Sequence, residues 1–230
     1  MALLNVTVGG LFCGSVAELW PGRPTSGIQK DPVSGPQHLG LEGFDRDAQA
    51  DLSVHGGPDK ALHHYPAEHY LLWQAEGLME AGTQPAAFGE NISTEGMTEE
   101  TACIGDIFTL GSATVQISQG RQPCWKLNAH TGHDTMAYLF QKTGRTGWYY
   151  RVLVPGKVEV GDPLTLLERL HPDLSVEMVT RARLTKKIAS ADAVRLSEIP
   201  ELAENWRAAF GKMAAGNLNE NTSARLTGKS

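Results

Sequence analysis

Residues 104–128 read IGDIFTLGSATVQISQGRQPCWKLN. Two arms of this stretch, 106–110 and 113–118, are rich in β-branched and aromatic residues and flank the dipeptide Gly111-Ser112. A short Gly-containing link between two such runs is typical of a tight β-hairpin. The second arm leads directly into a loop that carries Cys124, so the hairpin also places this thiol at the end of a strand.

Further short β-like segments lie on both sides of the hairpin. We predict strands at residues 25–30, 148–154, 157–160 and 162–168, the second and third of which flank Pro155-Gly156 as a hairpin would. Several short strands separated by Gly and Pro turns indicate a mainly β fold, either a barrel or a sandwich.

Two helices are predicted between the strands, in positions where they would flank or plug the sheet. One has Pro66 in its first turn and contains Tyr70 and Trp73, and the other is capped by Asp134 and ends at Gly144. Proline in a first turn, an aspartate cap and a terminal glycine are common helix boundary signals.

The pattern changes after about residue 170. Short helices are predicted to start at Ser175, Ser190 and Pro200, and the last carries a stripe of Leu202, Trp206, Phe210 and Met213 at helical spacing. We therefore expect a β domain at residues 1–170, a small three-helix bundle at 171–216 and a polar, frayed tail at 217–230.

The composition limits the classes of function. The chain has 230 residues and a formal net charge of −6, which argues against a nucleic acid polymer as partner, because such binding needs many cationic contacts. No apolar run is long enough to cross a membrane, and the N-terminus does not read as a signal peptide. The three cysteines suggest neither a disulfide framework nor a zinc site, so we expect a cytoplasmic protein.

Cys124 is the strongest candidate for chemistry. It lies between Arg121 and Lys126, and cationic neighbours favour the thiolate, which is the form that binds soft metals. The alternative is a buried cysteine that acts as a small apolar side chain, which is how we interpret Cys13 and Cys103.

Other polar loop residues are candidates for the walls of a pocket. His55 precedes Gly56-Gly57, whose backbone can approach an anion or simply form a tight turn. Glu90 and Asn91 can serve a heterocycle or a turn, and Lys30 can neutralise a phosphate or remain solvated. For His63, His64 and His69 we expect a surface or helix-packing role. No dinucleotide-binding glycine loop and no P-loop is present.

Four segments together resemble the MOSC family, in its YiiM-like branch. They are Val-His-Gly-Gly-Pro-Asp-Lys-Ala at 54–61, Tyr-Pro-Ala-Glu-His-Tyr at 65–70, Phe-Gly-Glu-Asn at 88–91, and 118–128. The resemblance extends over roughly residues 15–168, and the helical tail is similar to the three-helix domain of that branch. It implies a MOSC-type β-barrel with flanking helices and a small C-terminal three-helix bundle.

The resemblance also implies a molybdenum cofactor (molybdopterin) whose metal is bound by Cys124. It implies reduction of N-hydroxylated compounds such as 6-hydroxylaminopurine, with electrons from a separate flavin-dependent reductase. On this interpretation the cofactor pocket draws on Lys30, His55, Gly56, Gly57, Glu90, Asn91, Ser118 and Arg121.

The sequence departs from the family pattern at two places. Gly120 replaces a usual proline, which predicts a more flexible cysteine loop, and Arg46-Asp47 replaces a usual Gly-Asp, which predicts a changed pocket wall. Two other functions remain open. One is a carrier of the molybdenum cofactor or of sulfur without turnover, and the other is a thiol-dependent enzyme without metal. Transfer of the cofactor to an apo-enzyme without reduction of hydroxylated bases would favour the carrier, and stoichiometric molybdenum would reject the enzyme without metal. The molybdenum content of the wild type and of Cys124→Ala tests cofactor and ligand together.

Overall fold

The computed structural model describes residues 4–51, 56–217 and 222–228. Its strands are β1 (Asn5–Cys13), β2 (Asp31–Pro32), β3 (Gln37–Gly40), β4 (Gly43–Phe44), β5 (Leu62–Pro66), β6 (Ile92–Thr94), β7 (Ile107–Leu110), β8 (Ala113–Gly120), β9 (Trp148–Val154), β10 (Gly156–Val158) and β11 (Pro163–Glu168). Its helices are the 3-10 turn η1 (Pro58–Lys60) and α1 (Glu68–Ala75), α2 (Lys126–Thr131), α3 (Met136–Thr143), α4 (Val176–Thr185), α5 (Ser190–Glu198), α6 (Glu204–Ala214) and α7 (Thr222–Thr227).

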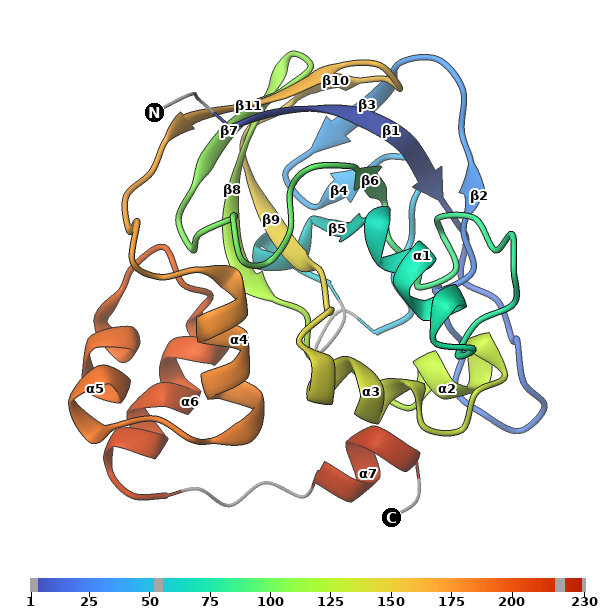
Figure 1. The fold of residues 1–230 in the computed structure, drawn as a ribbon. Coiled ribbons are helices and arrows are strands. Elements are labelled where there is room, and N and C mark those ends of the chain that lie inside the picture. Colours follow the sequence, from blue (N-terminus) through green and yellow to red (C-terminus); the bar gives the residue numbers. More distant parts are fainter. Residues whose placement is uncertain (1–3, 52–55, 218–221, 229–230) are drawn as a thin grey trace.

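The strands close into a barrel (Figure 1). The order runs β11-β7-β8-β9-β5-β6-β1, and β1 returns to β11. The β5–β6 pair is parallel, whereas the other pairs of the ring are antiparallel. A small sheet of order β10-β3-β4 lies beside the ring. The mainly β barrel with flanking helices is thus confirmed.

The central hairpin forms as its sequence predicts. Leu110 pairs with Ala113, and Gly111 takes a positive φ of 56° that L side chains rarely adopt. The expected hairpin across Pro155-Gly156 is wrong, because β10 leaves β9 and pairs with β3, with Gly156 opposite Leu39. The strand expected at 25–30 is wrong as well. Only Ser26 bridges Ala17, and the next paired strand is β2.

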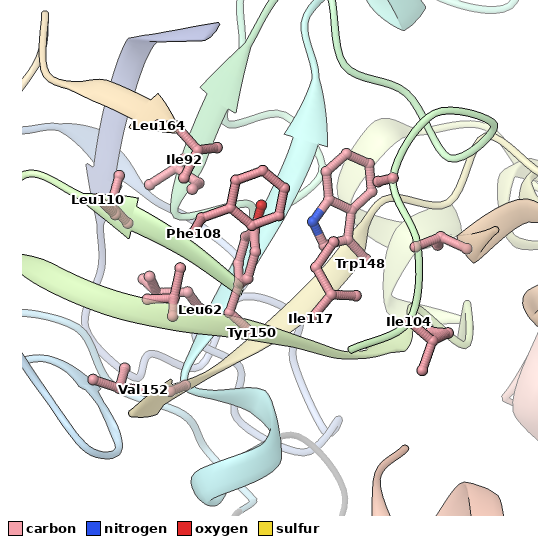
Figure 2. Packing of buried hydrophobic residues seen from close by; sticks show 14 of the residues in the cluster. Leu62, Ile92, Ile104, Phe108, Leu110, Ile117, Trp148, Tyr150, Val152 and Leu164 are labelled. Atoms are coloured by element: carbon pink, nitrogen blue, oxygen red, sulfur yellow. The ribbon is translucent and has the colours of Figure 1, made fainter. Parts of the chain in front are cut away.

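The barrel interior is filled by alternate residues of neighbouring strands (Figure 2). Ile117 on β8 pairs with Tyr150 on β9, and both are fully buried beside Phe108 and Leu62. Each such side chain contributes roughly 1.5–3 kcal/mol of burial free energy. In β9 the buried Trp148, Tyr150 and Val152 alternate with partly exposed residues, which fixes the face of this strand that points into the barrel.

Helices α1, α2 and α3 lie on one side of the barrel and α4–α6 on the other (Figure 1). The helix expected to open at Pro66 begins at Glu68, because Pro66 still pairs with Thr94 in the sheet. Thr135, not Asp134, precedes α3, although Gly144 ends that helix in the left-handed conformation as predicted. No described helix is long and apolar enough to span a membrane.

The C-terminal helices form close to their predicted positions. Ser175 caps α4 by accepting a hydrogen bond from the Met178 amide at 3.1 Å, and the stripe residues Trp206 and Phe210 are buried. The last of the three begins at Glu204 rather than at Pro200. Trp206 and Phe210 belong to the same apolar cluster as the barrel interior, so the division at residue 170 stays a prediction. Within the expected polar tail, α7 is a further helix.

Candidate cofactor cleft around Cys124

A cleft opens at the end of the barrel where β8 leads into the cysteine loop. It is lined by Ser26, Gly27, Ile28, Lys30, Asp47, Ala48, Gln49, Ala50, Lys60, His63, Gly89, Asn91, Arg121, Cys124, Lys126 and Tyr149. These residues come from segments far apart in the sequence, which the barrel brings together.

Cys124 is placed between the end of β8 and the start of α2. Its carbonyl accepts a hydrogen bond from Leu127 at 3.0 Å, and its side chain is half-buried on the wall of the cleft. It is therefore not sealed in the apolar core. Cys13 and Cys103 are buried, and burial raises the pKa of each thiol to about 11, so both are far poorer nucleophiles or ligands at neutral pH.

Arg121 provides a buried positive charge beside the thiol. Its side chain donates from Nη1 to the Phe88 carbonyl at 2.7 Å, and its backbone N–H donates to the Gly147 carbonyl at 3.0 Å. Burial raises the pKa of the Tyr149 phenol, Arg121 opposes this rise, and Cys124 adds to it. Tyr149 thus responds to both groups and remains a neutral hydrogen-bond donor.

Lys30 lines the cleft but is neutralised within the protein. Its ammonium forms a buried ion pair with Asp47, whose Oδ1 also accepts from the Gly14 amide at 2.9 Å. Asn91 donates to Asp47 Oδ2 at 2.9 Å, and its Oδ1 accepts from the His63 amide at 3.0 Å. The amide of Asn91 therefore holds the wall together. Asp47 lies on this wall, whereas Arg46, which replaces the usual glycine, is not among the lining residues, so the changed wall stays a prediction.

Two further lysines were not among the predicted pocket residues. Lys126 is 8% exposed and donates to the Thr25 carbonyl at 3.0 Å. Burial lowers the pKa of Lys60, which lies at the end of η1. The signal for Lys126 was its position two residues after Cys124, and the signal for Lys60 was its place at the end of the His-Gly-Gly segment.

His63 is a correction to the sequence interpretation. The side chain is buried on the cleft wall, with its ring centroid 5.0 Å from that of Tyr149. Burial and then the charge of Arg121 lower its pKa well below the usual value, so the imidazole is neutral. His64 and His69 lie elsewhere, bonded to Tyr150 and Glu99 respectively.

Several predicted pocket residues do not line the cleft. Ser118 donates to the Asp59 carbonyl at 2.6 Å, which ties η1 to β8. Glu90 is fully buried and accepts from the Tyr70 hydroxyl at 2.5 Å and from two backbone amides of its own loop. Gly56 and Gly57 are described but are not among the lining residues, and His55 lies outside the described residues.

The expectation of a flexible loop at Gly120 is also wrong. Gly120 is buried in β8, where it pairs with Trp148 and lies against Thr180 of α4. A glycine is needed here for close approach of a helix to the strand, which holds the start of the cysteine loop in place.

The residues of the cleft fit an anionic cofactor that contains a soft metal. The thiol of Cys124 is a soft ligand. Arg121 and Lys126 donate to neutral carbonyls, and neither forms an ion pair with a carboxylate in the part of the chain that the structure describes. Gly27 and Gly89 also form part of the wall, where the lack of a side chain lets them pack closely against Ala48 and Ile28.

The fold is thus a closed β-barrel with the Cys124 thiol and two buried cations in a cleft at a strand end. Residues 51–165 match the MOSC domain, and this chain belongs to the MOSC domain family. The family is linked to the molybdenum cofactor, so the resemblance seen in the sequence is confirmed at this level.

Relatives cover nearly the whole chain. Protein YiiM of Escherichia coli (strain K12) is 40% identical over 220 residues, which are 95% of this chain and 97% of that protein. Uncharacterized protein YflK of Bacillus subtilis (strain 168) is 46% identical over 189 residues, 81% of this chain and 84% of that protein. The crystal structure of YiiM from Escherichia coli matches with a TM-score of 0.80 at 34% identity, covering 97% of this chain and 98% of that one.

One further relative has a functional name, but the match covers only part of its length. A protein named "Reductase" from Gibberella moniliformis (strain M3125 / FGSC 7600) is 38% identical over 186 residues, which are 79% of this chain but 32% of that protein. The family links this chain to the molybdenum cofactor, and the name "Reductase" belongs to that longer protein.

Proposed function

We propose that this protein binds the molybdenum cofactor with the Cys124 thiolate as the protein ligand of the metal. We further propose that it reduces N-hydroxylated compounds such as 6-hydroxylaminopurine. The observation that carries this proposal is the half-buried thiol of Cys124 on the wall of a cleft that also contains Arg121 and Lys126. A thiolate suits a soft metal, and the two cations suit the phosphate of a pterin cofactor.

When bound, the cofactor supplies a metal centre that exchanges an oxygen atom and two electrons. The chain binds and orients it through Cys124, Arg121 and Lys126. The Tyr149 phenol stays protonated because burial raises its pKa, so it can donate a hydrogen bond to an oxygen atom in the cleft. The neutral His63 ring can accept or donate one from the same wall.

The overall reaction consumes a hydroxylamine, two electrons and two protons and releases an amine and water. The N–O bond breaks, and the nitrogen compound is reduced. We propose that the electrons come from a separate flavin-dependent reductase and that the reaction takes place in the cytoplasm.

The test begins with metal and pterin content of protein made in a cofactor-competent host. We expect stoichiometric molybdenum in the wild type, none in Cys124→Ser, and no change in the matched control Cys103→Ser, whose thiol is buried elsewhere. Absence of molybdenum from the wild type would reject the proposal and favour a thiol enzyme without metal.

The second step adds a purified flavin-dependent reductase and 6-hydroxylaminopurine to the loaded protein. Substrate loss that depends on Cys124 supports the reductase. Loaded protein that consumes no substrate but passes its cofactor or sulfur to an apo-enzyme would instead be a carrier.

A further inference from the structure

The C-terminal helix α7 lies apart from the three helices that precede it. It packs against α3, on the side of the molecule where α2 and the cysteine loop are found (Figure 1). Hydrogen bonds join α7 to this loop.

Arg225 of α7 is bonded to both peptide groups that flank Cys124. Its Nη1 donates to the carbonyl of Pro123 at 2.6 Å, and its own carbonyl accepts from the backbone N–H of Trp125 at 2.7 Å. Its Nη2 donates to Gln141 Oε1 at 3.0 Å on α3. One residue of the tail therefore joins the cysteine loop to a helix of the barrel flank.

Neighbouring contacts hold the same segment in place. Asn128 donates from Nδ2 to the Leu226 carbonyl at 3.0 Å, and Arg23 donates from Nη1 to the Gly228 carbonyl at 3.1 Å. The Arg23 guanidinium also lies 5.0 Å from the ring centre of Trp125, the residue after the cysteine. Arg23 and Asn128, which precede and follow Trp125 in the sequence, thus both bond to the tail.

Arg121 and Trp125, on either side of the cysteine, are held by different parts of the chain. Arg121 is bonded to the barrel through Gly147, and beyond this point the amide of Trp125 is satisfied by the tail. A guanidinium–carbonyl hydrogen bond is charge-assisted and stronger than a neutral one. The direction of the peptide on either side of the thiol therefore depends on Arg225.

We propose that Arg225 is a positioning residue, which holds the Cys124 loop so that the thiol faces the cleft. The C-terminal segment thereby completes the cofactor site. This inference rests on the proposed function for what the thiol binds, but the positioning itself can be measured without any cofactor.

The first measurement uses apo-protein and iodoacetamide, with each cysteine followed separately by mass spectrometry. Cys13 and Cys103 are internal references, because burial raises the pKa of both thiols to about 11. The Cys124 rate is recorded against pH, which separates the accessibility of the thiol from its ionisation. We expect Arg225→Ala to change the plateau rate by roughly five- to tenfold, as expected for loss of a charge-assisted hydrogen bond.

Two further variants and one control test the positioning role. Arg225→Lys keeps the charge but cannot reach both acceptors, so it should restore the rate only in part. Gln141→Ala removes the second anchor and should give a smaller change in the same direction. Arg195→Ala removes an arginine that pairs with Asp173 on the remote helices and should leave the rate unchanged.

The second measurement is the molybdenum and pterin content of the same variants after gel filtration. We expect Arg225→Ala to retain several-fold less cofactor than the wild type and than Arg195→Ala. Unchanged alkylation profiles and unchanged cofactor content in Arg225→Ala would overturn the positioning role. A wild type without molybdenum would overturn the proposed function, while the alkylation result would still decide the role of Arg225.

Discussion

A β-carbon added to Gly120 would lie 1.8 Å from the hydroxyl oxygen of Thr180. Gly120 is the last residue of β8, and Thr180 is a buried residue of α4. The C-terminal helices are thus in direct contact with the strand that leads into the Cys124 loop. This contact leaves no room for a side chain at residue 120.

We expect Gly120→Ala to lower the free energy of unfolding by about 1–3 kcal/mol, because β8 or α4 must move to admit the methyl group. Thr180→Ala should cost less than about 1 kcal/mol, since its hydroxyl is buried without a hydrogen-bond partner among the described residues. Urea unfolding of both single variants and the double variant measures the coupling. Strictly additive costs would show that this contact does not limit the site.

The buried pair of Lys30 and Asp47 gives a second prediction. Asp47→Asn leaves the Lys30 ammonium without its counter-charge, so we expect a loss of about 3–5 kcal/mol in the free energy of unfolding. Asp45→Asn is the matched control. The Asp45 carboxylate is 67% exposed and pairs with His38, so its loss should cost less than about 1 kcal/mol. Equal costs in urea unfolding would contradict the structural role of Asp47.

The barrel could be predicted because its signals are local. Two β-like arms and the turn between them predict the hairpin at 104–118. Cations close to Cys124 in the sequence indicate that this thiol is a candidate ligand. Pairings that need the closed barrel could not be predicted. Lys30 precedes β2, Asp47 follows β4 and Asn91 precedes β6, so these residues meet only in the folded protein.

Tertiary contacts explain an error at the site. Glu90 and Asn91 are adjacent in the loop before β6, and both were expected in the pocket. Asn91 bonds to Asp47 on the cleft wall, whereas Glu90 bonds to Tyr70 and to amides of its own loop. The role of Arg225 could not be predicted for a different reason. The tail has no apolar stripe, and hydrogen bonds to a distant loop leave no periodic pattern in a sequence.

The buried histidines predict a loss of stability in mild acid. Burial lowers the pKa of His64 from 6.5 to about 3, and burial with Arg121 lowers that of His63 well below 6.5. Below about pH 6.5 these two histidines bind protons in the unfolded chain but stay neutral in the folded protein. Stability present above this pH is therefore lost as pH falls, by up to about 1.4 kcal/mol per pH unit for each histidine.

Urea unfolding at pH 7.5, 6.5 and 5.5 checks this dependence. His64→Gln removes one of the two titrations, so its stability should fall less steeply with pH than that of the wild type. His38→Gln, on the exposed surface, should keep the wild-type slope. A wild-type protein equally stable at all three values would contradict the neutral, buried state of these rings.

The last prediction concerns Lys60, whose ammonium lines the cleft although burial lowers its pKa. A partly desolvated ammonium group attracts an anionic ligand strongly. Lys60→Met should therefore reduce the retained molybdenum and pterin several-fold. The apo-protein should change its free energy of unfolding by less than about 1 kcal/mol, because a half-buried lysine adds little to stability. Lys142→Met, an exposed lysine of α3, is the matched control and should retain the cofactor fully. Cofactor content equal in the two variants would mean that Lys60 plays no part in anion binding and that Arg121 and Lys126 supply the charge alone.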